Sequence, residues 1–141
     1  MDLKEWVVHH IKQKDLVKKD LISYKEEKDR VLCDYKEGRK GAYHFGENLE
    51  LSKIKAVKQD ETATFVCLCN EHNFKILVNN WGLFKQKTNL TFIFLNPNIA
   101  EKWIIKPHVH AKIADPKTLK QGLRTMYDTC MGKAISENNM Q

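Results

Sequence analysis

Two apolar runs without alternation are the strongest constraint on how this chain can fold. Residues 63–69 read Ala-Thr-Phe-Val-Cys-Leu-Cys, and residues 90–95 read Leu-Thr-Phe-Ile-Phe-Leu. Short runs that are apolar on both faces are typical of strands buried between two layers. Between them, apolar residues from Phe74 to Phe84 recur at helical spacing after Asn70, whose side chain can cap one helix that reaches Lys85. This succession predicts a parallel right-handed crossover in the middle of a sheet.

The residues before this unit predict a helix and then an antiparallel meander. Asp2 and Glu5 form a possible capping box, and the residues that follow are apolar at helical spacing. Three short apolar runs come next, separated by charged turns of hairpin length, at residues 21–24, 30–35 and 42–45. A short helix at residues 51–57 is then expected to cross over the sheet.

The residues after this unit predict one more strand and one more helix. Residues 103–105 are expected to form a strand that Pro107 stops. Asp115 followed by Pro116 predicts a helix start, and Gly132 predicts its end. The buried stripe of this helix is expected to consist of Leu119, Leu123, Met126, Tyr127 and Cys130. The sequence therefore predicts a single α/β domain over residues 1–132, in which helices cover a central mixed sheet, and a flexible tail over residues 133–141.

Composition narrows the class of protein. The chain has 141 residues, of which 42% are hydrophobic, enough for one continuous core. No apolar run approaches the roughly 18 residues of a membrane helix, so we expect a cytoplasmic protein without membrane contact. A formal charge of +6 favours polyanions or acidic surfaces as partners.

The positive charge collects between residues 101 and 124, where six lysines and arginines stand against two acidic residues. Lysines, imidazoles and the free amides of a helix start are groups that bind phosphates. The sequence therefore predicts a nucleic-acid-binding surface made of Lys102, Lys106, His108, His110, Lys112, Lys117, Lys120 and Arg124. The alternative is a solvated helix face that happens to be basic.

Two motifs raise the question of a metal site. Cys67 and Cys69 lie two residues apart on a predicted strand, where their sulfurs share a face but lie too far apart for one tetrahedral zinc. His108 and His110 follow Pro107 in a segment expected to be extended, with both imidazoles on one side. No cysteine or carboxylate stands at ligand spacing beside them. We therefore predict no metal site and expect Cys33, Cys67, Cys69 and Cys130 to be reduced core residues.

The order of predicted elements over about residues 2–106 resembles that of restriction-endonuclease-like proteins, the PD-(D/E)xK superfamily. The resemblance implies an acidic residue on the second strand and a Glu-x-Lys triplet on the third, which together hold Mg²⁺ beside a lysine. Asp34 matches the first position. Residues 42–47 contain no such triplet, and Glu26-Glu27-Lys28 has the spacing but lies in a predicted turn. The chain therefore resembles a member without the usual metal site, or it has a different α/β fold.

These observations leave three functions open. The first is a non-enzymatic or catalytically degenerate domain that binds nucleic acid through phosphates and needs no cofactor. The second is a protein-interaction or homodimerisation module that uses an exposed sheet edge or the helix with Trp6. The third is a nuclease that needs Mg²⁺ and in which Asp34 and Glu47 come together in space. No glycine-rich phosphate loop or nucleophile motif is present, which disfavours a nucleotide-dependent enzyme.

Overall fold

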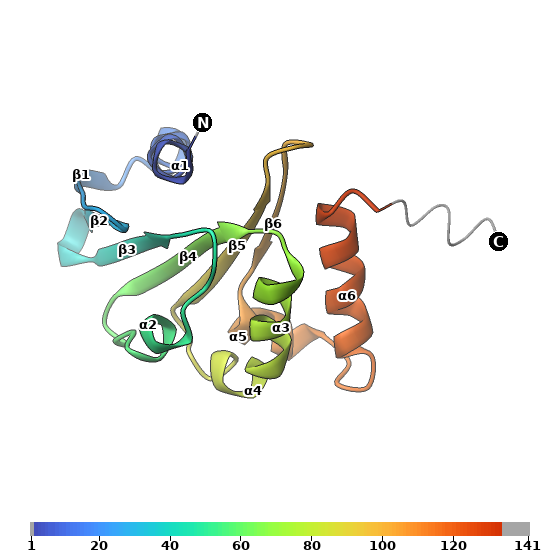
Figure 1. The fold of residues 1–141 in the computed structure, drawn as a ribbon. Helices are drawn as coiled ribbons and strands as arrows, with labels where there is room; N and C mark the ends of the chain where they lie inside the picture. The colour runs from blue at the N-terminus through green and yellow to red at the C-terminus, as the bar shows by residue number, and fades with distance from the viewer. Residues whose placement is uncertain (1, 134–141) are drawn as a thin grey trace.

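The structure of the protein is a computed structural model that describes residues 2–133. Its described part forms one six-stranded sheet in the order β1-β2-β3-β4-β5-β6. The strands are β1 (Leu21–Glu26), β2 (Arg30–Tyr35), β3 (Lys40–Phe45), β4 (Thr62–Leu68), β5 (Leu90–Asn96) and β6 (Glu101–Ile105). Strand β2 is antiparallel to both β1 and β3, and β6 is antiparallel to β5, whereas β3, β4 and β5 run parallel to one another. The predicted mixed α/β fold, with its meander and its parallel crossover, is confirmed (Figure 1).

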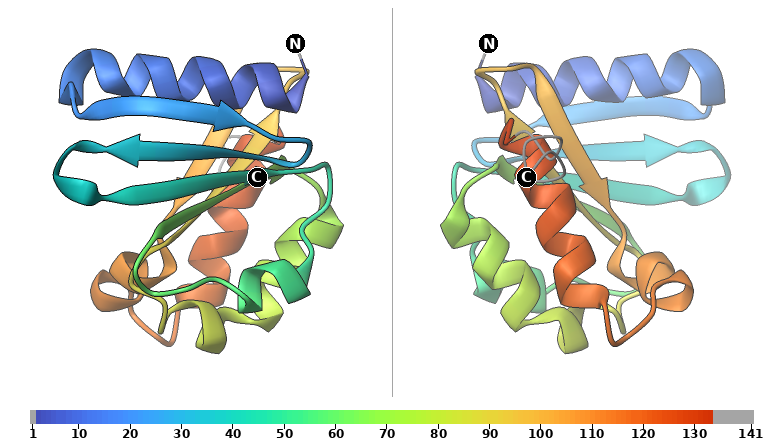
Figure 2. Two further views of the ribbon diagram at one scale, coloured as in Figure 1. Left: turned by 90° about the vertical axis from the view of Figure 1, so that its left-hand side faces the viewer. Right: turned by 90° about the vertical axis from the view of Figure 1, so that its right-hand side faces the viewer.

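The helices are distributed unequally over the two faces of the sheet (Figures 1 and 2). One face carries only α1 (Leu3–Lys18) among the described residues. The helices of the other face are α2 (Leu51–Lys55), α3 (Glu71–Asn79), α4 (Trp81–Phe84), α5 (Pro107–Ile113) and α6 (Leu119–Cys130). A short 3-10 turn, η1 (Lys36–Gly38), joins β2 to β3. The sheet therefore separates a thin layer from a thick one.

The middle strands β4 and β5 bury side chains on both faces, as their sequences predict. Phe65 and Phe92 point toward the five-helix face, while Val66 and Ile93 point toward α1, where they meet Val7. All five side chains are at most 4% exposed. Because both faces of these strands are covered, the sheet is the common wall of two hydrophobic clusters.

The first helix is fixed at both of its ends. The Asp2 carboxylate accepts a hydrogen bond from the amide of Glu5 at 2.8 Å, which satisfies one of the free amides of the first turn. At the other end, Lys19 adopts a left-handed conformation with φ of 53°. The Asp15 carboxylate then accepts the amides of Asp20 and Leu21 at 2.9 and 2.8 Å. These bonds turn the chain directly from α1 into β1.

Two segments have a secondary structure other than the one predicted, and in both a proline is the reason. Residues 108 and 110 were expected in an extended segment, but Pro107 occupies the first turn of α5, where its fixed φ favours a helix. Asp115 and Pro116 were expected to start a helix, but they begin a turn in which the Asp115 carboxylate accepts the amide of Lys117 at 3.0 Å. The last helix therefore begins later, at Leu119.

Two further expectations about the helices are also corrected. The helix after Asn70 was expected to continue to residue 85, but it divides into α3 and α4 at Asn80. The Asn80 side-chain amide donates to the carbonyl oxygen of Ile76 at 2.9 Å, a local bond that competes with helix continuation. Met126 was expected in the buried stripe of the last helix, but it is 47% exposed.

The predicted tail, residues 133–141, lies outside the described residues except for Lys133. The Lys133 ammonium lies 3.6 Å from a carboxylate oxygen of Asp128. Among the helices of residues 2–133, none has the length and apolarity required to cross a membrane.

Candidate functional site

Lys102 and Lys106 of the predicted basic surface lie at the edge strand β6, on the side of the sheet that carries α1. Alternation along β6 buries Trp103 and Ile105 against the five-helix face and leaves Lys102 and Ile104 exposed on the other. Lys106 follows the strand with an extended backbone and continues this alternation. The edge strand and the residue after it therefore present two lysines, four residues apart, toward α1.

The first helix presents a matching series toward β6. Trp6, His10 and Lys14 follow one another at intervals of four residues, which places them on one side of the helix. Four helix residues advance about 6 Å, and two strand residues advance about 6.6 Å. Lys102 contacts Trp6 of the helix, and Lys106 lies near enough to Lys14 for its charge to lower the pKa of Lys14, so both strand lysines face charged or aromatic residues of this helix series. We name His10, Lys14, Lys18, Lys102 and Lys106 the basic row.

Stacking contacts hold one end of the basic row. The Lys102 ammonium lies 5.8 Å from the ring centroid of Trp6. The Trp6 ring stacks on the imidazole of His10, with centroids 4.9 Å apart and planes 12° apart. The His10 ring in turn meets the edge of Tyr43 at 5.9 Å. Lys102 of β6 is thus fixed against α1 by a cation–π contact.

The electrostatics of the basic row are unfavourable in the free protein. Burial and, after it, the charges of Lys102 and Lys14 together lower the pKa of His10 to about 4. Partial burial also lowers the pKa of Lys14, followed by the charges of Lys18 and Lys106. Among the described residues, no ion pair includes a member of the row. Like charges therefore gather here without carboxylates that would pair with them.

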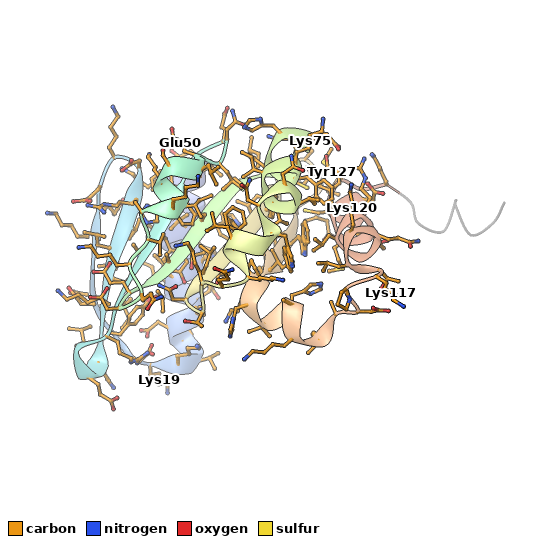
Figure 3. All side chains as sticks on the ribbon, turned by 90° about the horizontal axis from the view of Figure 1, so that it is seen from below. Lys19, Glu50, Lys75, Lys117, Lys120 and Tyr127 are labelled. Carbon is orange, nitrogen blue, oxygen red and sulfur yellow. The ribbon has the colours of Figure 1, made fainter. Side chains whose placement is uncertain are left out.

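The other predicted basic residues lie on elements of the five-helix face. Lys112 is exposed on α5, Lys117 is exposed in the turn before α6, and Lys120 is exposed on α6. Figure 3 shows Lys117 and Lys120 far from Lys19, the residue that ends α1. The structure therefore divides the predicted surface between two faces and does not bring its residues together.

Arg124 is held within the protein. Its guanidinium lies 2.6 Å from a carboxylate oxygen of Glu71 and 3.7 Å from one of Asp128. It also lies 5.1 Å from the ring centroid of Phe74 and 5.3 Å from that of Tyr127. This network joins α6 to α3, so the observed role of Arg124 is to fix two helices to each other.

His108 and His110 do not form a pair. Residues two apart on a helix point in different directions, and the two imidazoles accordingly have separate partners. Nδ1 of His108 lies 3.0 Å from the carbonyl oxygen of Lys85. The His110 ring meets the edge of Trp81, with centroids 5.7 Å apart. Both rings therefore contribute to the contact between α5 and α4.

Asp34 and Glu47, the two weak catalytic candidates, lie at opposite ends of the sheet. Asp34 pairs with Lys40 at the start of β3, whereas Glu47 comes after Phe45 at its end. The length of β3 alone separates these positions by more than about 15 Å. The expected convergence of the two carboxylates is therefore wrong, because the meander places them at opposite ends of β3.

A second acidic residue at the end of β3 is Asp29, which comes from the turn before β2. Its carbonyl oxygen accepts the amide of Phe45 at 3.1 Å. Its carboxylate lies 2.9 Å from the ammonium of Lys53, and this hydrogen bond lowers the pKa of Asp29. The Asp29 carboxylate is thus engaged by a lysine from α2.

A cleft of about 1320 Å³ lies at the carboxyl ends of the three parallel strands β3, β4 and β5. In α/β sheets, this edge is where ligands bind most often. The cleft has apolar walls from Leu3, Phe45, Leu68 and Leu95. Its charged lining residues are Asp2, Lys4, Lys28, Asp29, Glu47, Glu101 and Lys102. Trp6 and Lys102 line the cleft and also form the end of the basic row, so the two features are continuous.

Asn73 supports the floor of this cleft, and no sequence motif pointed to it. Its side chain is 0% exposed. The amide nitrogen donates to the carbonyl oxygens of Glu47 and Leu68, each at 2.8 Å. The amide oxygen accepts the backbone amide of Leu49 at 2.8 Å. A single side chain of α3 therefore holds the segments that follow β3 and β4 side by side.

The four cysteines are free and buried. Cys67 and Cys69 point to the same face of β4, as predicted, and lie in the cluster beneath the five helices. Burial raises the pKa of the Cys67 thiol well above its usual range. Within residues 2–133, no three His, Cys, Asp or Glu side chains are grouped so that they could hold a metal ion.

Comparisons with protein families, with curated proteins and with solved structures found no match for this chain. The resemblance to restriction-endonuclease-like proteins, which depends on the order of elements, stays a prediction.

Proposed function

We propose that this protein binds nucleic acid through its phosphates along the basic row, without a catalytic step. The observation that supports this function is the alignment of Lys14 and Lys18 on α1 with Lys102 and Lys106 at β6. Two segments that are far apart in the sequence thus contribute positive charges to one surface, where no carboxylate pairs with them among the described residues.

The arrangement suits a chain of phosphates better than a single anion. A pocket for one anion would bring its donors around one point, whereas the row spreads its charges along α1 and β6, with a rise of about 6 Å from Lys14 to Lys18 and of about 13 Å from Lys102 to Lys106. Burial is the main reason why the pKa of His10 and of Lys14 is lowered, and bound phosphates would offset the like charges that add to it. Clustered perturbed groups of this kind are typical of functional surfaces.

The size of the row limits the strength of binding. If all four lysines neutralise one phosphate each, log K falls with log salt concentration with a slope of about −3.6 for duplex DNA. The protein is therefore expected to bind weakly at physiological salt, because four phosphate contacts are fewer than the roughly six to ten that larger interfaces make.

Charge reversal within the row tests the proposal. The probe is a fluorescein-labelled DNA strand of about 20 nucleotides, whose anisotropy is followed over a series of salt concentrations. The double variant Lys14→Glu/Lys106→Glu is expected to bind at least about tenfold more weakly at about 50 mM salt, with a salt slope smaller by about 1.4, the value for two phosphate contacts on a single strand.

The matched control is Lys55→Glu/Lys58→Glu, which makes the same change of net charge at two exposed lysines of the five-helix side. This control is expected to retain most of the affinity. An equal loss in both variants would overturn the proposal, because binding would then depend on net charge alone. A larger loss in Lys117→Glu/Lys120→Glu would instead place the interface at α6.

The same measurements separate the protein-interaction alternative. Self-association that does not respond to salt, with no binding of the labelled strand, would favour the homodimerisation module. A nuclease built on Asp34 and Glu47 is not proposed, because these residues lie at opposite ends of β3. The cytoplasmic location and the partner protein stay predictions.

A further inference from the structure

We infer that the cleft at the carboxyl ends of β3, β4 and β5 receives an unpaired nucleotide of the nucleic acid that the basic row binds. This inference rests on the proposed function and adds to it a preference for single strands. The steps that lead to it are the continuity of the cleft with the row and the chemistry of the cleft lining.

The basic row leads into the cleft. Trp6 and Lys102 are members of the cleft lining, and they contact each other where α1 begins. Both views of Figure 2 show the start of α1 beside the turn between β5 and β6. A strand whose phosphates follow the row from Lys106 to Lys102 would therefore arrive at the mouth of the cleft.

The walls of the cleft suit the face of a base. Leu68 and Leu95 come from the ends of β4 and β5, and Phe45 comes from the end of β3. Apolar and aromatic side chains pack against bases without regard to sequence, because every base has an apolar face. A cleft of about 1320 Å³ is larger than most small-molecule pockets, so it has room for at least one nucleotide.

The rim of the cleft suits the polar parts of a nucleotide. Lys4 and Lys28, together with Lys102, can contact its phosphate. The carboxylates of Glu47 and Glu101 take part in none of the ion pairs found in residues 2–133. Free carboxylates accept hydrogen bonds from the amino and imino groups of bases. In a duplex those edges are paired and the faces are stacked, so only an unpaired nucleotide can use the cleft.

Gly46 offers a way to block the cleft without disturbing the fold. It lies in the lining, and a methyl group added at its Cα would meet only the carbonyl oxygen of Asn48, at 3.6 Å. The variant Gly46→Leu would therefore add bulk to the lining of the cleft. The matched control is Gly122→Leu on α6, where an added methyl group meets nothing within 4 Å.

The experiment compares a single strand of about 12 nucleotides with a blunt duplex of the same length, by anisotropy at one salt concentration. The native chain is expected to prefer the single strand by about tenfold, the effect of packing one or two bases. Gly46→Leu is expected to abolish this preference and to keep the affinity for the duplex. Gly122→Leu is expected to keep both.

The outcomes separate this inference from the proposed function. If the native chain binds both probes with equal affinity, or if Gly46→Leu retains the preference, the inference is wrong and the proposed function stands. If the native chain binds neither probe, the proposed function is wrong and the inference fails with it. Circular dichroism of Gly46→Leu verifies that a loss of preference does not reflect unfolding.

Discussion

The two faces of the sheet solve the problem of covering a hydrophobic surface in different ways. The five-helix face buries large rings such as Phe92, Phe94 and Trp103, and pairs the charge of Arg124 with Glu71. The α1 face buries smaller aliphatic side chains beneath one helix and places unpaired lysines beside it. The comparison indicates that one face contributes most of the packed rings, whereas the other carries the lysines to which our proposal assigns nucleic-acid binding.

The largest expected effect is loss of stability on the five-helix face. Phe92 is 0% exposed, and its ring lies 5.0 Å from that of Phe84 and 6.1 Å from that of Phe65. Phe92→Ala is expected to lower the free energy of unfolding by about 4 kcal/mol, because it leaves a cavity among packed rings. Urea denaturation gives this value.

Ile11 provides the corresponding test on the α1 face. It is 3% exposed, and Ile11→Ala is expected to lower the free energy of unfolding by about 2 to 3 kcal/mol. The control is Val17→Ala, at a position that is 85% exposed, with an effect below about 0.5 kcal/mol. If Ile11→Ala proves more harmful than Phe92→Ala, the proposed division between the faces is broken.

The next effect concerns the pH dependence of the α1 face. The pKa of His10 is about 4 in the folded protein against an ordinary value of 6.5. Below pH 6.5 the unfolded chain therefore binds a proton that the folded chain does not, and stability falls until the pH reaches about 4. The loss amounts to roughly 3 kcal/mol at most.

Comparison with His10→Gln isolates this effect. His44 also has a lowered pKa, which burial causes, but it is present in both proteins and cancels in the difference. Urea denaturation at pH values above and below the titration is expected to show a smaller loss in the variant. Parallel stability curves for the two proteins would show that His10 titrates normally and that the row is less crowded than its geometry indicates.

The smallest effect is a gain of stability from removing one charge. Lys14→Gln takes away a like charge from beside Lys18 and Lys106. At low salt the variant is expected to be more stable by about 0.5 kcal/mol, and the gain is expected to vanish near 1 M salt, where the Debye length is about 3 Å. The same variant is expected to bind nucleic acid more weakly. A less stable variant at low salt would mean that Lys14 has a structural role.

Much of the fold follows from local pattern. The apolar runs around Phe65 and Phe92 predicted the two central strands, and Asp2 predicted the start of the first helix. Proline was the main source of error: the strand ends before Pro107 as predicted, but the residues that follow form a helix, and Pro116 lies in a turn instead of at a helix start. A proline at a helix start and a proline that stops a strand have the same sequence context, and only packing against the rest of the chain distinguishes them.

The basic row could be predicted only in part. Lys102 and Lys106 belonged to the predicted surface, but His10 and Lys14 did not, although their spacing from Trp6 was visible in the sequence. The sequence could not show that the residues spaced four apart on α1 would lie near Lys102 and Lys106 at β6. That contact depends on how the sheet places α1 relative to β6, and no local sequence pattern encodes this placement.

The strict order of the strands bears on how the chain assembles. Each strand lies beside the strand that precedes it in the sequence, so no strand must wait for a partner that is made later. Contacts between neighbours in sequence close short loops and favour rapid folding. During synthesis on a ribosome, which proceeds from the amino end, the sheet can therefore grow one strand at a time. The exposed edge at each stage is covered by the next strand, which shortens the period in which the nascent chain is open to aggregation.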